Sequence, residues 1–179
     1  MAAVAGCPFK LRQSAAADDG GQHRGQGPPR GGWRKRGEYN QAIGRSRGGR
    51  TTKIHALADG QGRLYALLLT PGQTPDIYGA SILIGMVPPP GNLLGDTAYD
   101  GNQFRKALAE QGTHAVIRPM RHRRQPAPFD RLAYRQRNII ERAFCRIKDW
   151  RAIATRYDKT ARNFLAALSL VVAVTQWVS

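Results

Sequence analysis

Alternating apolar and polar positions begin at Thr51 and define the first extended segments of the chain. The run "TTKIHALAD" alternates and stops at "GQG", after which "RLYALLLTPG" follows as a second extended run. Two extended runs joined by a short glycine-containing loop are typical of a β-hairpin. The pattern therefore predicts antiparallel strands at about 52–59 and 63–70.

The rest of the chain alternates between short apolar runs and helical periodicity. The runs "NLLGDTAYD" and "THAVIRP" predict short buried strands at about 91–96 and 114–118. Helical spacing predicts helices in "TPDIYGASILIGMV" and "NQFRKALAEQG", and two more at about 130–150 and 160–178. A hairpin followed by alternating helices and strands predicts an α/β fold, a mixed sheet flanked by helices.

Residues 1–40 lack this periodicity and are rich in Gly, Arg and Gln. Such a composition predicts a disordered basic tail, followed by one folded domain at 41–179. The most apolar segment, "FLAALSLVVAVTQWV", has about 15 residues, whereas a membrane-spanning helix needs about 20. We therefore expect a buried C-terminal helix and no membrane partner.

The net charge of the chain indicates which classes of partner it binds. Its 179 residues include 28 Lys and Arg but only 12 Asp and Glu, which gives a formal net charge of +16. A balance this basic favours nucleic acid first and an anionic membrane surface second, while an arginine-biased protein is the plain alternative. The two cysteines, Cys7 and Cys145, form neither a disulfide framework nor a zinc pattern. A reducing, cytoplasmic location is expected.

Four polar residues share one face of the helix predicted at 130–150. Tyr134, Glu141 and Lys148 are seven residues apart, and Arg137 precedes the glutamate by four. Seven residues are close to two helical turns, so these side chains point the same way. A glutamate in such a place usually faces water or pairs with a base four residues away.

The glutamate gains interest beside Asp96, which follows a predicted strand. Ligands bind at the carboxyl ends of strands in open α/β sheets, although a lone aspartate there is more often a turn former or helix cap. Two carboxylates, from Asp96 and Glu141, are hard oxygen ligands that suit Mg²⁺ or Mn²⁺. Arg137 and Lys148 would then contact phosphates, and Tyr134 would pack against a sugar or cap the row of polar side chains.

Two other titratable residues have plain structural interpretations. Asp100 precedes "GN" at the start of a predicted helix, which is the setting of a turn or capping residue. His55 lies on an extended run and is interpreted as a core histidine without an assigned role.

The spacing Y-x2-R-x3-E-x6-K of Tyr134, Arg137, Glu141 and Lys148 resembles the signature of bacterial insertion-sequence transposases of the DDE type. The strings "LLGDTAYD", "GRSRGGRTTKIHALAD", "LTPGQTPD" and "IATRYDKTARNFLAAL" are similar to the same family, so the resemblance covers about 41–178. It implies a ribonuclease H-like fold in which Asp96 and Glu141 are catalytic acids that hold two divalent metal ions. It also implies DNA partners, both element ends and target, and a homo-oligomer when active.

The resemblance also bears on two basic segments. Arg45 to Arg50 and Arg118 to Arg124 are solvated charge runs by default. Their places in the family pattern raise the prospect that they contact the DNA backbone.

The family's first aspartate has no counterpart in a strand-like run. The only acids upstream of "GRSRGG" are Asp18, Asp19 and Glu38. If the codons of "DDGGQHRGQGPPR" are shifted by one base, they permit Met-Met-Val-Asp-Ser-Thr-Val and then Val-Lys-Ala-His-Arg-Ala, which resembles the missing motif. We infer that the first 40 residues are out of frame with the domain, in a decayed fragment or a programmed-frameshift product.

This departure shapes the expected function. We expect a sheet without its usual first strand, one poorly covered slot, and a transposase domain that is inactive alone. The alternative is a non-catalytic DNA-binding transposase remnant or regulator. A basic RNA-binding protein is disfavoured because the sequence has no aromatic RNP-type run and no KH loop.

Overall fold

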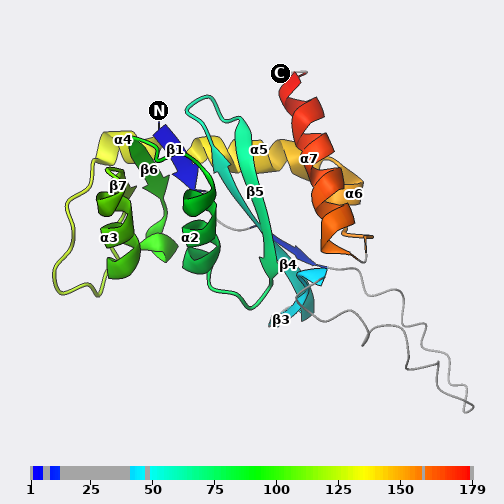
Figure 1. Cartoon of the computed structure of the whole chain (residues 1–179), viewed down its shortest axis with the longest axis horizontal. Helices are drawn as coiled ribbons and strands as arrows, with labels where there is room; N and C mark the ends of the chain where they lie inside the picture. The colour runs from blue at the N-terminus through cyan, green and yellow to red at the C-terminus, as the bar shows by residue number, and fades with distance from the viewer. Residues whose placement is uncertain (1, 6–8, 13–40, 47–48, 159, 178–179) are drawn as a thin grey trace, which may run out of the picture.

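The computed structural model describes residues 2–5, 9–12, 41–46, 49–158 and 160–177. Within these ranges the chain is a mixed α/β protein, with helices on both faces of a sheet (Figure 1). No helix in these ranges is both long and apolar enough to cross a membrane.

The sheet is organised around its longest strand, β4. Antiparallel partners of β4 are β1, β2, β3 and β5, and β1 continues the sheet through parallel pairing with β6 and then β7. The strands are β1 (Ala2–Ala5), β2 (Phe9–Arg12), β3 (Gly44–Ser46), β4 (Gly49–Ala58), β5 (Leu64–Pro71), β6 (Asn92–Gly95) and β7 (His114–Ile117). All four strands predicted from the pattern are therefore present, with ends moved by at most three residues.

The turn between β4 and β5 is held by the side chain of Asp59. Its Oδ1 accepts hydrogen bonds from the backbone N–H groups of Gln61 at 2.9 Å and Arg63 at 3.0 Å. Gly62 has a φ of 83°, a conformation that favours glycine. The "DGQG" segment thus closes the hairpin with local chemistry that its sequence already contains.

The helices pack against the two faces of the sheet. They are α2 (Asp76–Met86), the 3-10 helix η2 (Thr97–Tyr99), α3 (Asn102–Glu110), α4 (Arg131–Arg135), α5 (Asn138–Lys148), α6 (Arg151–Ala154) and α7 (Ala161–Trp177). The single helix predicted at 130–150 is divided, because α4 ends at Arg135 and α5 begins at Asn138.

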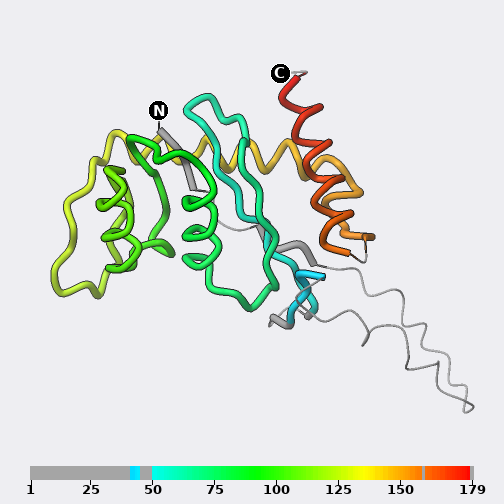
Figure 2. The backbone as a smooth tube through the Cα atoms, viewed as in Figure 1, coloured from blue at the N-terminus to red at the C-terminus, as the bar shows by residue number. Residues whose placement is uncertain are grey.

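Strand alternation separates the core into two clusters, one on each face. Ile54, Leu94 and Val116 face α5, α6 and α7, whereas Leu57, Leu93 and Ile117, at odd spacings from them on the same strands, face α2, η2 and α3. The tube in Figure 2 shows α2 and α3 on one side of the strands and α5 crossing on the other. This arrangement follows from the period of two in β-strands, which sends successive side chains to opposite faces.

The N-terminal segment corrects two expectations. Residues 2–5 and 9–12 form strands rather than part of a disordered tail, and β1 lies between β4 and β6, where a missing strand was expected. The composition of residues 1–40 as a whole hid this, because its Gly and Arg content lies mainly after residue 19. Residues 13–40, which carry the proposed frame change, lie outside the described residues.

Candidate functional site

Asp96 lies directly after β6 and caps the 3-10 helix η2. Its Oδ1 accepts a hydrogen bond from the backbone N–H of Ala98 at 2.9 Å, and the residue is partly exposed. The capping role that the sequence suggested for a lone aspartate is therefore present. It uses one carboxylate oxygen and leaves the side chain at a strand end near solvent.

Glu141 lies in the first turn of α5 and forms an ion pair with Arg137. The distance between Arg137 Nη2 and Glu141 Oε1 is 2.8 Å, and the glutamate side chain is 52% exposed. An acid that begins a helix is also favoured by the partial positive charge of that end. Arg137 and the N-terminus of α5 therefore stabilise the charge of Glu141 whether or not a ligand is bound.

Aromatic contacts extend this pair into a continuous row. The guanidinium carbon of Arg137 lies 5.7 Å from the ring centre of Tyr134, whose ring meets that of Phe129 edge-on at 5.5 Å. Lys148 ends α5 and is exposed. The structure thus brings Tyr134, Arg137 and Glu141 into direct contact, with Lys148 two turns further along the same helix face.

The described residues do not complete a site for two metal ions. Asp96 and Glu141 offer the hard oxygen ligands that Mg²⁺ and Mn²⁺ prefer. In the part of the chain that the structure covers, no group of three or more His, Cys, Asp or Glu side chains could hold a metal. Glu141 also has a cationic partner of its own. This donor set is too small for the two-ion site implied by the resemblance.

Asp100 is a buried anchor that the sequence did not identify as important. Its carboxylate is 1% exposed and forms ion pairs with Arg105 Nε at 2.8 Å and with Arg123 Nη1 at 2.6 Å. It also accepts a hydrogen bond from the backbone N–H of Met120 at 2.8 Å. Burial raises the pKa of Asp100, but these hydrogen bonds and charges outweigh it and hold the pKa below its usual value.

The Asp100 contacts change the interpretation of the basic loop at 118–124. Arg123 points to Asp100 and Asn102 instead of lying free in solvent, so its charge is already matched. Arg118, Arg121 and Arg124 remain exposed or partly exposed. The loop therefore divides into an inward anchor and outward bases, which the charge run alone could not reveal.

A second buried polar group lies between β4 and α2. His55 is 1% exposed, and its Nε2 lies 2.7 Å from Thr70 Oγ1, while its Nδ1 has no hydrogen-bond partner. Burial lowers the pKa of His55 to about 4, with the charge of Asp76 opposing and that of Lys53 adding to the effect. The interpretation of His55 as a core histidine is confirmed.

The "IATRYDK" string has a structural role through Arg156. This arginine is buried, donates to the backbone carbonyl of Gln41 at 2.7 Å, and contacts Thr52. Its guanidinium carbon lies 4.9 Å from the ring centre of Phe164. Arg156 thereby joins the start of α7 to β4, and it is not available to bind DNA.

Comparison with known proteins places these motifs in context. A family model described as a transposase DDE domain matches residues 17–175. A transposase of insertion sequence element IS6501 from Brucella ovis is 32% identical over 125 residues, which is 69% of this chain and 96% of that protein. The matched residues include the elements that carry Asp96, Asp100 and Glu141.

Proposed function

Because the chain belongs to the insertion-sequence transposases with a DDE domain, we propose that it is a DNA-binding transposase catalytic domain with a ribonuclease H-like fold. The proposal assigns Asp96 and Glu141 as two of the catalytic acids, and Tyr134, Arg137 and Lys148 as residues that hold the DNA. The observation that carries it is the contact row Tyr134–Arg137–Glu141 on α4 and α5.

The sheet supports this assignment. β1 is the central strand, because it pairs antiparallel with β4 on one side and parallel with β6 on the other. Asp96 follows the carboxyl end of β6, which is the strand next to β1. Polar residues at this edge are placed where open α/β sheets bind ligands. The helices α4 and α5 contact β6, β7, β1 and β4, so they cross the same sheet.

The chemistry proposed for the complete family site is phosphodiester exchange. Water attacks a phosphorus atom of the DNA backbone and releases a 3′ hydroxyl. This hydroxyl then attacks a phosphorus atom of the target DNA and displaces the 3′ oxygen of the target strand, which leaves as a hydroxyl. Family members typically use divalent metal, which stabilises the charge that develops on the attacking and leaving oxygens. In this chain, Arg137 and Lys148 would position phosphates by charge-assisted hydrogen bonds.

We infer that this polypeptide does not cut DNA on its own. Two closely spaced dications need several carboxylates to offset their repulsion, and the described residues offer Asp96 and Glu141 without a third acid. Loose geometry is costly, since a misplacement of about 1 Å can reduce a rate about 10²-fold.

The test is a strand-cleavage assay with Mg²⁺ or Mn²⁺ on DNA that carries the ends of the element. It compares the chain as given with one re-engineered to encode the shifted frame through Arg30 and to rejoin at Asn40. We expect cleavage from the repaired chain alone. Equal cleavage by both chains would show that another acid, such as Asp18, Asp19 or Asp59, supplies the third carboxylate.

The second candidate is a non-catalytic DNA-binding remnant or regulator. The small donor set favours it, because the described residues contain no group of three or more side chains that could hold a metal ion. The same assay separates the two candidates. If neither chain cleaves while both bind DNA, the remnant is the better description of the domain.

A further inference from the structure

An open hollow lies between α5 and the turn that joins β4 to β5. It is lined by Gln61, Ile139, Arg142, Cys145 and Arg146, and its volume is about 460 Å³. All of these except Ile139 are exposed. The hollow is therefore a concave surface lined by two arginines.

The hollow is on a different edge of α5 from the candidate catalytic row. At roughly 100° per residue, Arg142 is turned about 100° from Glu141, and Arg146 about 140°. Arg137 and Lys148 lie within about 40° of the glutamate by the same rule. The helix thus has two basic edges, one beside Glu141 and one facing the β4–β5 turn.

The wall opposite Arg142 and Arg146 is rigid. Asp59 fixes the turn by accepting two backbone hydrogen bonds and by forming an ion pair with Arg63 at 2.7 Å. The negative charge of Asp59 is therefore balanced by Arg63. Gly62 packs so closely on α5 that a Cβ atom there would lie 2.8 Å from Ile139 Cγ2. The shape of the hollow is therefore set by the protein alone.

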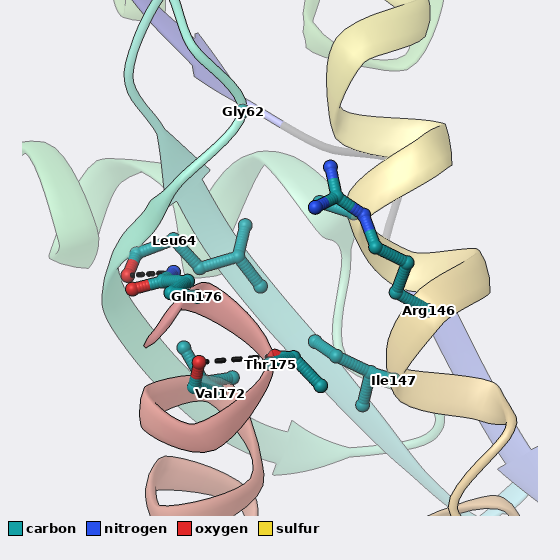
Figure 3. Close-up of a pocket in the computed structure, with 8 residues that line it drawn as sticks. Gly62, Leu64, Arg146, Ile147, Val172, Thr175 and Gln176 are labelled. Atoms are coloured by element: carbon teal, nitrogen blue, oxygen red, sulfur yellow. Dashed lines mark hydrogen bonds between the residues drawn. The ribbon is translucent and has the colours of Figure 1, made fainter. Parts of the chain in front are cut away.

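Arg146 also borders the β4–β5 hairpin. Figure 3 shows its side chain reaching from α5 toward the β4–β5 hairpin. It lines a second, narrower pocket together with Gly62, Leu64, Ala143, Ile147, Val172, Thr175 and Gln176.

We propose that the Arg142–Arg146 hollow is a second DNA-binding site, which takes the sugar–phosphate backbone. This inference rests on the proposed function, since it assumes that the domain binds DNA. Side chains four residues apart on a helix have Cβ atoms about 5–6 Å apart, so both guanidinium groups can reach phosphates of one strand. Arginine matches phosphate with paired donors, and the chain as a whole carries a charge of +16.

The consequence is a longer DNA path than the candidate catalytic row provides. DNA held at both edges of α5 contacts the domain beyond the phosphate that reacts near Glu141. Contacts to the backbone fix position and orientation without selecting sequence. The hollow therefore orients DNA relative to Asp96 and Glu141 and does not recognise bases.

Cys145 lines the hollow and is an exposed free cysteine, so DNA bound there should shield it. Because Cys145 also lies four residues after Glu141, the arginine variants below decide which edge of α5 shields it. Maleimide labelling of the full chain would be followed by mass spectrometry of peptides, which separates Cys145 from Cys7, with and without a short mixed-sequence duplex at low salt. We expect DNA to slow the labelling of Cys145 several-fold, over the concentration range in which fluorescence anisotropy reports binding.

A charge-matched pair of double variants tests the two arginines. Arg142→Ala with Arg146→Ala should lower the slope of log affinity against log salt by about 1.8 and abolish the protection of Cys145. Lys106→Ala with Arg162→Ala removes the same charge from exposed positions that do not line the hollow, and it should preserve the protection. Lysine at both hollow positions should restore the slope.

The outcomes separate this inference from the proposed function. Binding without protection of Cys145, or equal effects of the two double variants, overturns the hollow as a DNA site and leaves the proposed function intact. If the full chain binds no duplex even at low salt, both fail together. Unfolded variants would be recognised by loss of the thermal transition, and the milder single variants Arg142→Gln and Arg146→Gln would then replace the double alanine variant.

Discussion

The pH dependence of stability should reveal the buried state of His55. This histidine lies between β4 and α2, with Thr70 as its hydrogen-bond partner and with Lys53 and Asp76 as the nearest charges. Its surroundings are so tight that a Cβ atom on Gly79 would come within 2.4 Å of its ring. The imidazole of His55 is therefore neutral in the folded chain, and its protonation within the core is unfavourable.

The magnitude follows from the pKa of His55. Burial lowers it from 6.5 to about 4 in the folded chain. A difference of about 2.5 pKa units at about 1.36 kcal/mol per unit corresponds to about 3 kcal/mol. Since the unfolded chain binds this proton more readily, the stability from neutral His55 is complete above pH 6.5 and is lost as the pH falls toward 4.

The variant His55→Gln removes the titration and keeps a group that can hydrogen bond to Thr70. Urea denaturation of both proteins between pH 7.5 and pH 4 should show the unaltered chain losing about 3 kcal/mol more than the variant. His114→Gln is the control, because His114 is exposed. Parallel stability profiles for the unaltered chain and His55→Gln would refute the reasoning.

Three further predictions concern other contacts. Asp100→Asn leaves two partly buried arginines without a charge partner, and urea denaturation should show a loss of about 3–5 kcal/mol, whereas a loss below about 1 kcal/mol would exclude the anchor role. Gly62→Ala should cost about 1–3 kcal/mol through its positive φ and the clash with Ile139, while Gly60→Ala, which meets nothing within 4 Å, should change thermal stability little; equal costs would contradict this. Arg137→Ala should weaken DNA binding by anisotropy and lower the salt slope by about 0.9, and an unchanged slope would remove Arg137 from the proposed phosphate contacts.

Much of the sheet could be predicted because its signals are local. Strand alternation and the "DGQG" turn define β4 and β5, and the short runs "NLLG" and "HAVI" match β6 and β7. Each of these features depends on residues within about ten positions of one another. The capping role of Asp96 was also visible, because an aspartate can bond the backbone two residues on.

The contacts that the sequence did not reveal join distant segments. Asp100 meets Met120 and Arg123 about twenty positions later, and Arg156 meets Thr52 across the whole domain. A single sequence shows that such residues are charged but not which partner neutralises them. For this reason the run of charges in the sequence predicts a solvated Arg123, although this residue is a structural anchor.

The strand β1 shows that a place in the sheet and a catalytic side chain are separate requirements. A place in a sheet depends on backbone N–H and C=O groups, which nearly every residue offers, whereas catalysis depends on a particular side chain. Val4 pairs with Leu94, two residues before Asp96, so β1 occupies the position beside the candidate acid. Yet residues 2–12 contain no Asp or Glu, and they precede the stretch that matches the family, which begins at residue 17. The sheet therefore has a strand in its central slot without the acid expected there. The proposed inactivity of the chain follows from that missing carboxylate and not from a missing strand.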